Sequence, residues 1–410
     1  MTTVTNPLSA TSGAQFDQAQ FYLDRPDEVF RELRTHDPVH WYDDGKFWVI
    51  TKYDDIKAIS ARPHQFASER IAILMDLIAH KQGVEPQGYR NRGIMFLDPP
   101  VHRAHRRTFQ GRFTPAAVAR AEERVKEVVN EVFDALPDGE FDWIAHVAEP
   151  IPVYVFAYLL GVPEADWPKV AGWSTAISRS GSGAATQADF DVIMTEIGPY
   201  LLDIAKEKAQ NPVDDDLMTM LATLGEIDGV PFDDLQIMVY ALTLLAAGSE
   251  TTQSLIAGIA ECLASHTDQA RALFDDPSLV DNAIEEVLRY WTPVRSMARQ
   301  ATHDVELRGK VIREGDGVLL AYGSANRDTE HFGETADQFD IRRKDAPSHL
   351  GFGVGEHFCM GAALARREAR LTLDEIVKRA SGIEVTGERV PRPSALNNNF
   401  DLLPVTLNRR

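Results

Sequence analysis

The fold of this chain is decided by one stretch of sequence, Phe352-Gly353-Val354-Gly355-Glu356-His357-Phe358-Cys359-Met360-Gly361, with the helical run Ala362-Ala363-Leu364-Ala365-Arg366-Arg367 directly after it. Cys359 stands where a glycine-containing turn passes into the N-terminus of a helix. Backbone N–H groups and the positive end of a helix dipole favour the thiolate form of a cysteine, which is the form that binds a metal ion. The stretch therefore predicts a metal ligand, although a lone cysteine is most often a small buried hydrophobic residue.

Six positions of this stretch resemble the haem-ligand loop of the cytochrome P450 family: Phe352, Gly353, Gly355, His357, Cys359 and Gly361. In that family the cysteine is the proximal ligand of the haem iron. The resemblance implies haem b (iron protoporphyrin IX) as the cofactor, with Cys359 as the metal ligand and Phe352 and Gly353 against the haem. It also implies the P450 fold, which is mainly α with small β-sheets and forms a triangular helical prism around a buried haem.

A second stretch, Leu97 to Arg107, predicts a helix that begins after two prolines and carries His102 and Arg106 on one face. These two positions match family residues that bind a haem propionate. Arg299 matches a second propionate-binding arginine, and His357 a further contact. A buried carboxylate requires such cationic or hydrogen-bonding groups, whereas without the resemblance a basic surface patch is the simpler interpretation.

The longest predicted helix runs from Leu235 to about His266 and is apolar nearly all round in its first half, so we expect it to be buried. Asp233-Asp234 is its predicted cap. A second helix, amphipathic and packed by its valines, is predicted to begin at Thr114-Pro115.

The middle of the long helix reads Ala247-Gly248-Ser249-Glu250-Thr251-Thr252. A glycine, an acid and a hydroxyl in a buried helix cost stability and desolvation energy, and such local violations are expected at functional sites. The segment matches the oxygen-binding kink of the P450 family, which implies that Glu250 and Thr251 manage proton delivery beside Gly248. The alternative is a threonine hydroxyl bonded back to the carbonyl four residues earlier.

Glu286 and Arg289 are three residues apart on another predicted helix, a spacing that ordinarily indicates a weak surface pair. They match the Glu-x-x-Arg motif of the family, which joins a third residue in a buried structural triad. Arg342 is the expected third member. Ala336 stands where the family often carries a proline.

The substrate residues are carried over from family positions, and they are Arg295, Thr243, Ala246, Ala247, Val294, Met95 and Phe400. Mostly apolar walls with a few polar groups fit a small hydrophobic substrate, namely a terpenoid, a steroid, a fatty acid or an aromatic acid. We expect Arg295 either to pair with a substrate carboxylate or to point at solvent or at a haem propionate. Arg90 and Arg92 are weaker candidates for the same pairing.

The resemblance implies a monooxygenase that inserts one atom of dioxygen into a C–H bond, by hydroxylation or O-dealkylation. A thiolate ligand favours O–O cleavage. The alternative function is a haem-thiolate protein that binds or senses a ligand without turnover.

The sequence contains no fused flavin or iron–sulfur module, so electrons are expected from a separate ferredoxin and a ferredoxin reductase that uses NAD(P)H. Six arginines are candidates for a basic docking patch: Arg103, Arg107, Arg112, Arg366, Arg367 and Arg370. Local charge complementarity would steer an acidic partner. The alternative is a scatter of solvated arginines.

Composition limits the partners and the compartment. The chain has 410 residues and a formal net charge of −20, which argues against nucleic acid or an anionic membrane as a partner. Two cysteines suit a reducing cytoplasm, and the N-terminal residues, which have neither a basic segment nor an apolar core, are expected to be neither a signal peptide nor a membrane anchor. We expect a flexible segment at residues 1–20, one P450 domain at residues 21–410, and a β-hairpin from Val39 to Ile50.

Overall fold

The computed structural model of the chain describes residues 13–24, 26–84, 92–182 and 186–410. Its α-helices are α1 (Pro26–His36), α2 (Tyr53–Ser60), α3 (Leu74–Lys81), α4 (Val101–Phe109), α5 (Pro115–Asp134), α6 (Pro150–Leu159), α7 (Trp167–Gly172), α8 (Ser174–Ser182), α9 (Gln187–Val192), α10 (Gly198–Gln210), α11 (Leu217–Thr223), α12 (Asp234–Ser265), α13 (Thr267–Asp275), α14 (Val280–Tyr290), α15 (Tyr322–Ala325), α16 (Thr329–Phe332) and α17 (Ala362–Arg379). Its strands are β1 (Val39–Tyr42), β2 (Phe47–Ile50), β3 (Phe66–Ala67), β4 (Glu140–Asp142), β5 (Glu226–Ile227), β6 (Val230–Pro231), β7 (Met297–Ala301), β8 (Val305–Leu307), β9 (Lys310–Ile312), β10 (Gly317–Leu320), β11 (Ala380–Val385), β12 (Val390–Pro391), β13 (Phe400–Leu402) and β14 (Pro404–Arg409).

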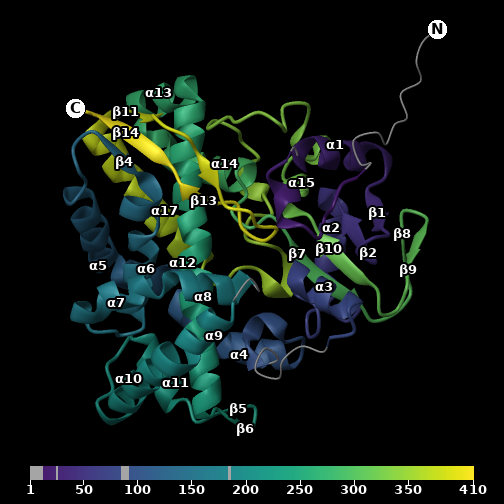
Figure 1. Cartoon of the computed structure of the whole chain (residues 1–410), viewed down its shortest axis with the longest axis horizontal. Helices are drawn as coiled ribbons and strands as arrows, with labels where there is room; N and C mark the ends of the chain where they lie inside the picture. The colour runs from purple at the N-terminus through teal and green to yellow at the C-terminus, as the bar shows by residue number, and fades with distance from the viewer. Residues whose placement is uncertain (1–12, 25, 85–91, 183–185) are drawn as a thin grey trace.

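Helix α12 is the central element of the molecule. It runs the length of Figure 1 and packs against α6, α8, α10, α14 and α17. The Asp233 side chain accepts a hydrogen bond from the backbone N–H of Gln236 and so caps its N-terminus. The predicted helix is confirmed to within one residue at each end, because the cap and the continuous apolar surface both lie in the local sequence.

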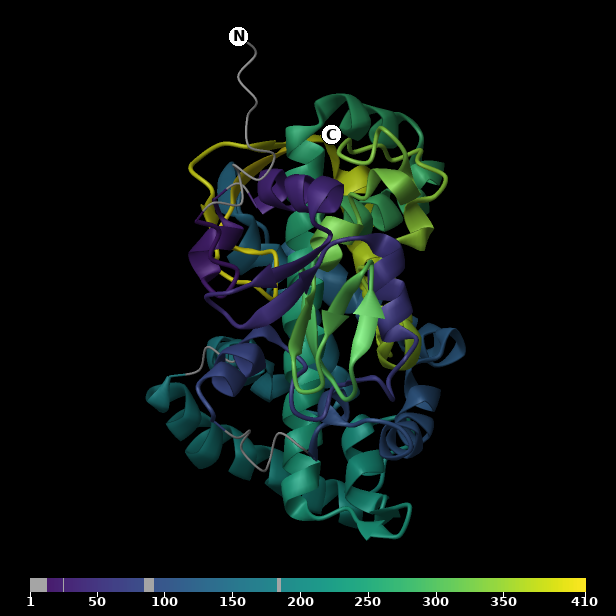
Figure 2. The same ribbon diagram turned by 90° about the vertical axis from the view of Figure 1, so that its right-hand side faces the viewer.

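The strands gather beside this helix in small sheets. The five-stranded sheet has the order β1-β2-β10-β7-β3, in which only β2 and β10 pair in parallel. Val39 pairs with Ile50, which confirms the predicted hairpin. Figure 2 shows this sheet in front of α12, while Figure 1 shows α5, α7 and α10 on the other side of that helix. Strand β7 carries Arg299 toward the interior, where it is 5% exposed.

The N-terminal expectation is wrong for residues 13–20. Phe16 is 1% exposed, and its ring packs edge-to-face on Phe21 and Tyr42 at centroid distances of 4.9 and 5.2 Å. The Tyr42 hydroxyl donates to the Asp17 carboxylate at 2.6 Å. One aromatic side chain therefore fixes a segment whose composition alone suggested flexibility, while residues 1–12 lie outside the described residues.

Glu286 and Arg289 form a fully buried ion pair, each with no exposed side-chain surface, and Arg289 Nε lies 2.7 Å from Glu286 Oε2. The third member is Arg343, whose Nε lies 3.3 Å from Glu286 Oε1. The expectation of Arg342 is therefore wrong, since that residue is exposed. A turn closed by the hydrogen bond from Arg343 N to Asp340 O directs Ile341 and Arg343 inward and Arg342 outward.

Candidate active site

The cysteine loop is shaped by backbone hydrogen bonds and two left-handed glycines. The N–H of Cys359 donates to the carbonyl of Phe352 at 2.9 Å, which closes the loop on itself. Gly353 and Gly355 have φ of 68° and 80°, a region that favours glycine. A Cβ on Gly355 would lie 2.4 Å from the carbonyl oxygen of Ser60, so α2 can approach the loop only at a glycine. Helix α17 begins at Ala362, three residues after Cys359, as predicted.

Cys359 is partly exposed. Its surroundings shift the pKa of its thiol in opposite directions. Burial raises the pKa of the Cys359 thiol above its ordinary value, and this effect outweighs the lowering by the Gly361 N–H and by the charges of Arg106 and Arg366. The helix terminus lies where the sequence predicted it, whereas the burial of the thiol was not predicted. A coordinated metal ion deprotonates a thiol outright. Binding of the iron would therefore convert the Cys359 thiol to the thiolate.

The four predicted propionate contacts lie together. His102 and His357 have ring centroids 4.2 Å apart, and Arg106 Nη1 donates to the Glu356 carbonyl at 3.0 Å. Burial, followed by the charges of Arg299, His102 and Arg106, lowers the pKa of His357 to about 2. His102 is 1% exposed, and its Nδ1 has no hydrogen-bond partner in the described chain. Two guanidiniums, of Arg106 and Arg299, and an unpaired nitrogen of His102 fit the carboxylates of a haem, because an anion would satisfy both the charges and the nitrogen.

Helix α12 has an uncovered face at the predicted oxygen site. Ala247 is exposed and Thr243 and Thr251 are half-buried, although most of the helix surface there is covered. The hydroxyl of Thr251 donates to the carbonyl of Ala247 at 2.7 Å, and that of Thr243 donates to Val239 at 2.7 Å. The structure thus shows the back-bonded threonine that was the alternative at sequence level. The lone pairs of the Thr251 hydroxyl remain available to accept a hydrogen bond from a molecule bound at this face of α12.

Gly248 has a packing role that the sequence did not indicate. A Cβ at this position would lie 2.0 Å from the ring of Phe156 on α6. The helix continues through this position without interruption. The glycine therefore admits an aromatic ring against α12, and no break in the helix is needed to explain it.

The Glu250 side chain lies on a different side of α12 from the uncovered face. It is 7% exposed and lines a cavity of about 20 Å³ together with Glu149 and Ser174, between α12, α6 and α8. Ala246 lines the same cavity. Ser174 donates to the Glu149 carboxylate. A cavity of this size is large enough for a water molecule, and Glu149 and Ser174 place polar groups beside Glu250 in an otherwise largely apolar lining.

Arg295 does not face the predicted substrate site. Its Nη1 donates to the carbonyls of Tyr22 and Ser394, each at 3.0 Å, and its Nη2 donates to the side chain of Asn398. These hydrogen bonds do not support the candidate roles of Arg295 toward a substrate carboxylate or a propionate, and because the residue is only half-buried it keeps partial contact with solvent. Arg92 pairs with Asp233 at 2.9 Å, and Arg90 lies outside the described residues.

Of the apolar candidates, Met95 and Val294 are half-buried, and Val294 forms a β-bridge with Asn397. Phe400 is 5% exposed and stacks on Trp291 at a centroid distance of 5.4 Å. Phe400 is thus part of the core and not an open wall, because Trp291 covers the face of its ring.

Sequence reasoning missed the cluster that holds the cysteine loop to α14. Glu285 accepts from Arg366 Nε at 2.6 Å and lies 3.2 Å from His349 Nε2. The N–H of Gly351 donates to His349 Nδ1 at 2.9 Å, which places the ring proton on Nε2. The Arg366 guanidinium lies over the Phe352 ring at 4.6 Å. Glu285 stands beside Glu286 in the sequence. This pair of adjacent acidic residues was the only feature of the sequence that could have indicated the cluster.

This cluster predicts a loss of stability in acid. Burial raises the pKa of Glu285, but hydrogen bonds and charges from Arg366 and His349 outweigh it and lower the pKa to about 2. A depressed carboxyl pKa stabilises the folded state above the ordinary value of about 4.5, and this stabilisation, about 3 kcal/mol, is lost as pH falls from there toward 2. Urea unfolding of the wild type and Glu285→Gln at pH 7, 4.5 and 3 measures it. The difference between the two free energies of unfolding should shrink in acid; a constant difference would contradict the assignment.

A cysteine presented by a glycine turn, a buried cationic cluster beside it and an uncovered face on a central helix together define the site of a haem-thiolate protein. The sequence profile of the family described as Cytochrome P450 matches residues 187–397. The chain is 33% identical to cytochrome P450 130 of Mycobacterium tuberculosis over 377 residues, which are 89% of this chain and 90% of that protein. It is 32% identical to vitamin D(3) 25-hydroxylase of Pseudonocardia autotrophica, covering 98% of this chain and 99% of that one.

Solved structures agree with these sequence matches. The crystal structure of CYP109E1 from Bacillus megaterium in complex with testosterone superposes with a TM-score of 0.80 at 30% identity, covering 94% of this chain and 98% of that one. The chain belongs to the cytochrome P450 family. It is a monooxygenase of that family with haem b as its cofactor. Within the described residues, no helix has the length and apolar character needed to span a bilayer.

Proposed function

We propose that this monooxygenase hydroxylates or O-dealkylates a neutral hydrophobic molecule of the steroid or terpenoid type. The observation that carries this proposal is that Arg295 already donates hydrogen bonds to two carbonyls and a side-chain amide. Arg92 is likewise occupied, in an ion pair with Asp233. A carboxylate substrate therefore finds neither of these predicted anchors free. The vitamin D hydroxylase relative and the testosterone complex of CYP109E1 support the same substrate class.

When bound, the haem supplies dioxygen activation. The chain supplies the thiolate of Cys359 to the iron and the cluster around His102 and Arg299 to the propionates. The Thr251 hydroxyl donates to the Ala247 carbonyl and accepts a hydrogen bond from the site. Glu250, which lines the small cavity with Glu149 and Ser174, is the acid assigned to proton delivery. The alternative of ligand sensing without turnover finds no support among relatives named as hydroxylases.

The substrate class is tested by titrating the ferric absorption spectrum of the haem protein with testosterone, vitamin D3, palmitate and benzoate. We expect the neutral molecules to shift the haem band toward high spin and the two carboxylates to leave it in place. Arg295→Ala should not change the shift. A shift by benzoate or palmitate that disappears in Arg92→Ala would contradict the proposal.

We further propose that a separate ferredoxin and its reductase deliver the electrons, in the cytoplasm, and that the ferredoxin docks on α4 and the cysteine loop. Of the six candidate arginines, five pair with carboxylates of this chain, which weakens the predicted basic patch. Arg107 is exposed and has no ion-pair partner among the residues that the structure describes. Phe358, next to the ligand, is 41% exposed. The Arg103–Glu356 ion pair holds α4 against the cysteine loop, so an exposed ring and an unpaired cation lie on two adjoining segments, which suits an acidic protein with an apolar contact.

Arg107→Glu is expected to slow reduction by an acidic ferredoxin about three- to tenfold at low salt, because it reverses a charge at the rim of this contact. Stopped-flow reduction measured against ionic strength tests this. Arg271→Glu on α13 makes the same charge change at the opposite end of the molecule (Figure 1) and should leave the rate unchanged. Equal slowing by both variants would show a general charge effect and no docking at Arg107.

A further inference from the structure

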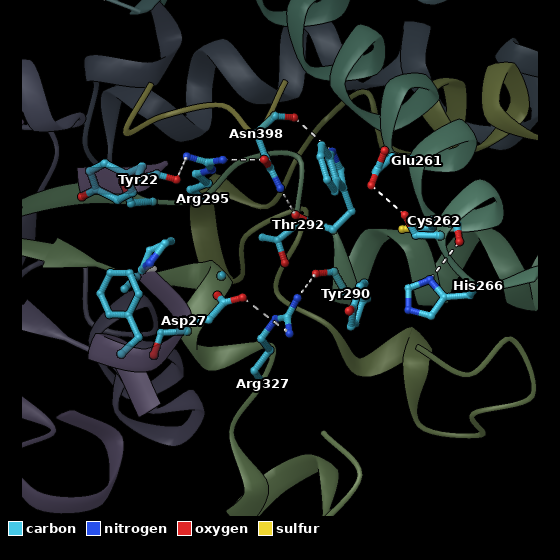
Figure 3. A pocket seen from close by; sticks show the side chains of 18 residues that line it. Tyr22, Asp27, Glu261, Cys262, His266, Tyr290, Thr292, Arg295, Arg327 and Asn398 are labelled. Carbon is cyan, nitrogen blue, oxygen red and sulfur yellow. Dashed lines mark hydrogen bonds and ion pairs between the residues drawn. The ribbon is translucent and has the colours of Figure 1, made fainter. Parts of the chain in front are cut away.

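A cavity of about 440 Å³ lies away from the haem site (Figure 3). Its walls come from α1, the C-terminal end of α12, the chain after α14 and the segment around α15. Cys262 marks its position on α12, about three turns or roughly 16 Å along the helix from Thr251. The volume is within the range of sites for small organic molecules.

Arg327 lines this cavity, and its guanidinium carries N–H groups that can donate hydrogen bonds to a ligand. Its Nη2 donates to the Tyr290 carbonyl at 3.1 Å. Its Nη1 lies 3.7 Å from a carboxylate oxygen of Asp27 and 3.7 Å from one of Asp337, and both distances exceed a hydrogen bond. The buried Asp337 Oδ1 has no hydrogen-bond partner in the described chain. Burial lowers the pKa of Arg327, but the charges of Asp27 and Asp337 and the contact with Tyr290 outweigh it and raise the pKa above its ordinary value. The charge is therefore matched by these acids, while Nη1 makes no hydrogen bond to either carboxylate.

Arg295 adds a second positive charge to the lining. All of its hydrogen bonds in the described chain go to carbonyls and an amide, so no carboxylate neutralises it directly. Burial lowers the pKa of Arg295 to about 10, as expected for a guanidinium that lacks a close anion. Glu261, also in the lining, is already bound by Arg389 at 2.7 Å. Asp27 is exposed and is the remaining acid in the lining.

Aromatic side chains supply the rest of the wall. The lining contains the buried Tyr22 and Phe30 from the N-terminal part of the chain, and Tyr290 and Trp291 at the end of α14. Tyr22 and Tyr290 lie on opposite sides of the cavity in Figure 3. The Arg327 guanidinium already lies over the Tyr290 ring at 4.2 Å. A flat apolar body would lose water contact against these rings, and its anionic end would reach the guanidinium.

We propose that this cavity is a second binding site, for a small organic carboxylate with an aromatic body, held by Arg327. The carboxylate takes the donors that Asp27 approaches only to 3.7 Å, and Asp27 turns to solvent. This inference is independent of the proposed substrate and redox partner.

The test is isothermal titration of the haem protein with naphthalene-2-carboxylate, after the haem cleft has been saturated with econazole, an azole that ligates the iron. Naphthalene-2-carboxamide is the neutral control of the same shape. We expect the carboxylate to bind with a Kd below about 1 mM, or more than roughly 4 kcal/mol, and the carboxamide to bind at least tenfold more weakly.

Variants locate the site. Arg327→Met should weaken carboxylate binding at least tenfold, Arg327→Lys should weaken it less, and Asp27→Asn should tighten it several-fold by removing the competing acid. Arg120→Met, an exposed arginine of α5, is the matched control and should bind as the wild type does. If Arg327→Met does not retain haem, Asp27→Asn and the carboxamide decide the question. No carboxylate binding, equal binding of the carboxamide, or weaker binding in Asp27→Asn would overturn the proposal.

Discussion

Arg289→Met is expected to lower the free energy of unfolding by about 3–5 kcal/mol, a large part of the 5–15 kcal/mol that is usual for a folded protein. Arg289 donates to both oxygens of Glu286 and to the carbonyls of Asn326, Ala336 and Gln338, at distances of 2.7 to 2.8 Å. Removing the guanidinium leaves a buried carboxylate with only Arg343 and the Asp340 N–H as partners, and three carbonyls without this donor. Urea unfolding and the yield of haem-loaded protein measure the effect.

Two neighbouring arginines provide the internal control. Arg343→Ala should also destabilise the protein, because its side chain is 6% exposed and bonds the Phe332 and Thr335 carbonyls besides Glu286. Arg342→Ala should change stability by less than about 0.5 kcal/mol, as is usual for exposed positions. If the two alanine variants were equally stable, the assignment of Arg343 as the third member would be wrong.

Thr251→Ala is expected to keep haem binding but to lower the product formed per NAD(P)H consumed by at least about tenfold, because a positioned proton-transfer group contributes about 10²–10⁴-fold to a rate. The missing product should appear as hydrogen peroxide, because dioxygen that is reduced without correctly delivered protons leaves before the substrate is oxidised. The measurement uses the panel compound that gives the largest spectral shift, with product, NAD(P)H and peroxide quantified together.

Thr243 offers a matched control for this experiment. It lies two turns earlier on the same face of α12 and makes the same hydroxyl contact to the carbonyl four residues before it. Thr243→Ala should therefore reproduce any effect on the helix itself while leaving coupling near the wild-type value, and Thr251→Ser should restore most of it. Normal coupling in Thr251→Ala, or equal uncoupling in Thr243→Ala, would remove the proton-delivery role.

The sequence determined the parts of this protein that depend on local order. The cysteine loop follows from glycines at fixed spacing, which its two left-handed turns and the approach of Ser60 require. The span of α12 follows from the Asp233 cap and an unbroken apolar surface. The helix α5 likewise begins at the predicted Thr114, whose hydroxyl accepts from Ala117 N. These signals lie within a few residues of the structure that they specify.

Only the tertiary structure decided where side chains with several choices point. Arg342 and Arg343 are adjacent and chemically identical, so a turn at Asp340 selected which one meets Glu286. Arg295 turned toward Tyr22 and Asn398 because carbonyls far away in the sequence meet there. The cavity beside Arg327 also exists only where α1 approaches the end of α12. Long flexible side chains take the partners that packing brings within reach, and those partners are not encoded near them in the chain.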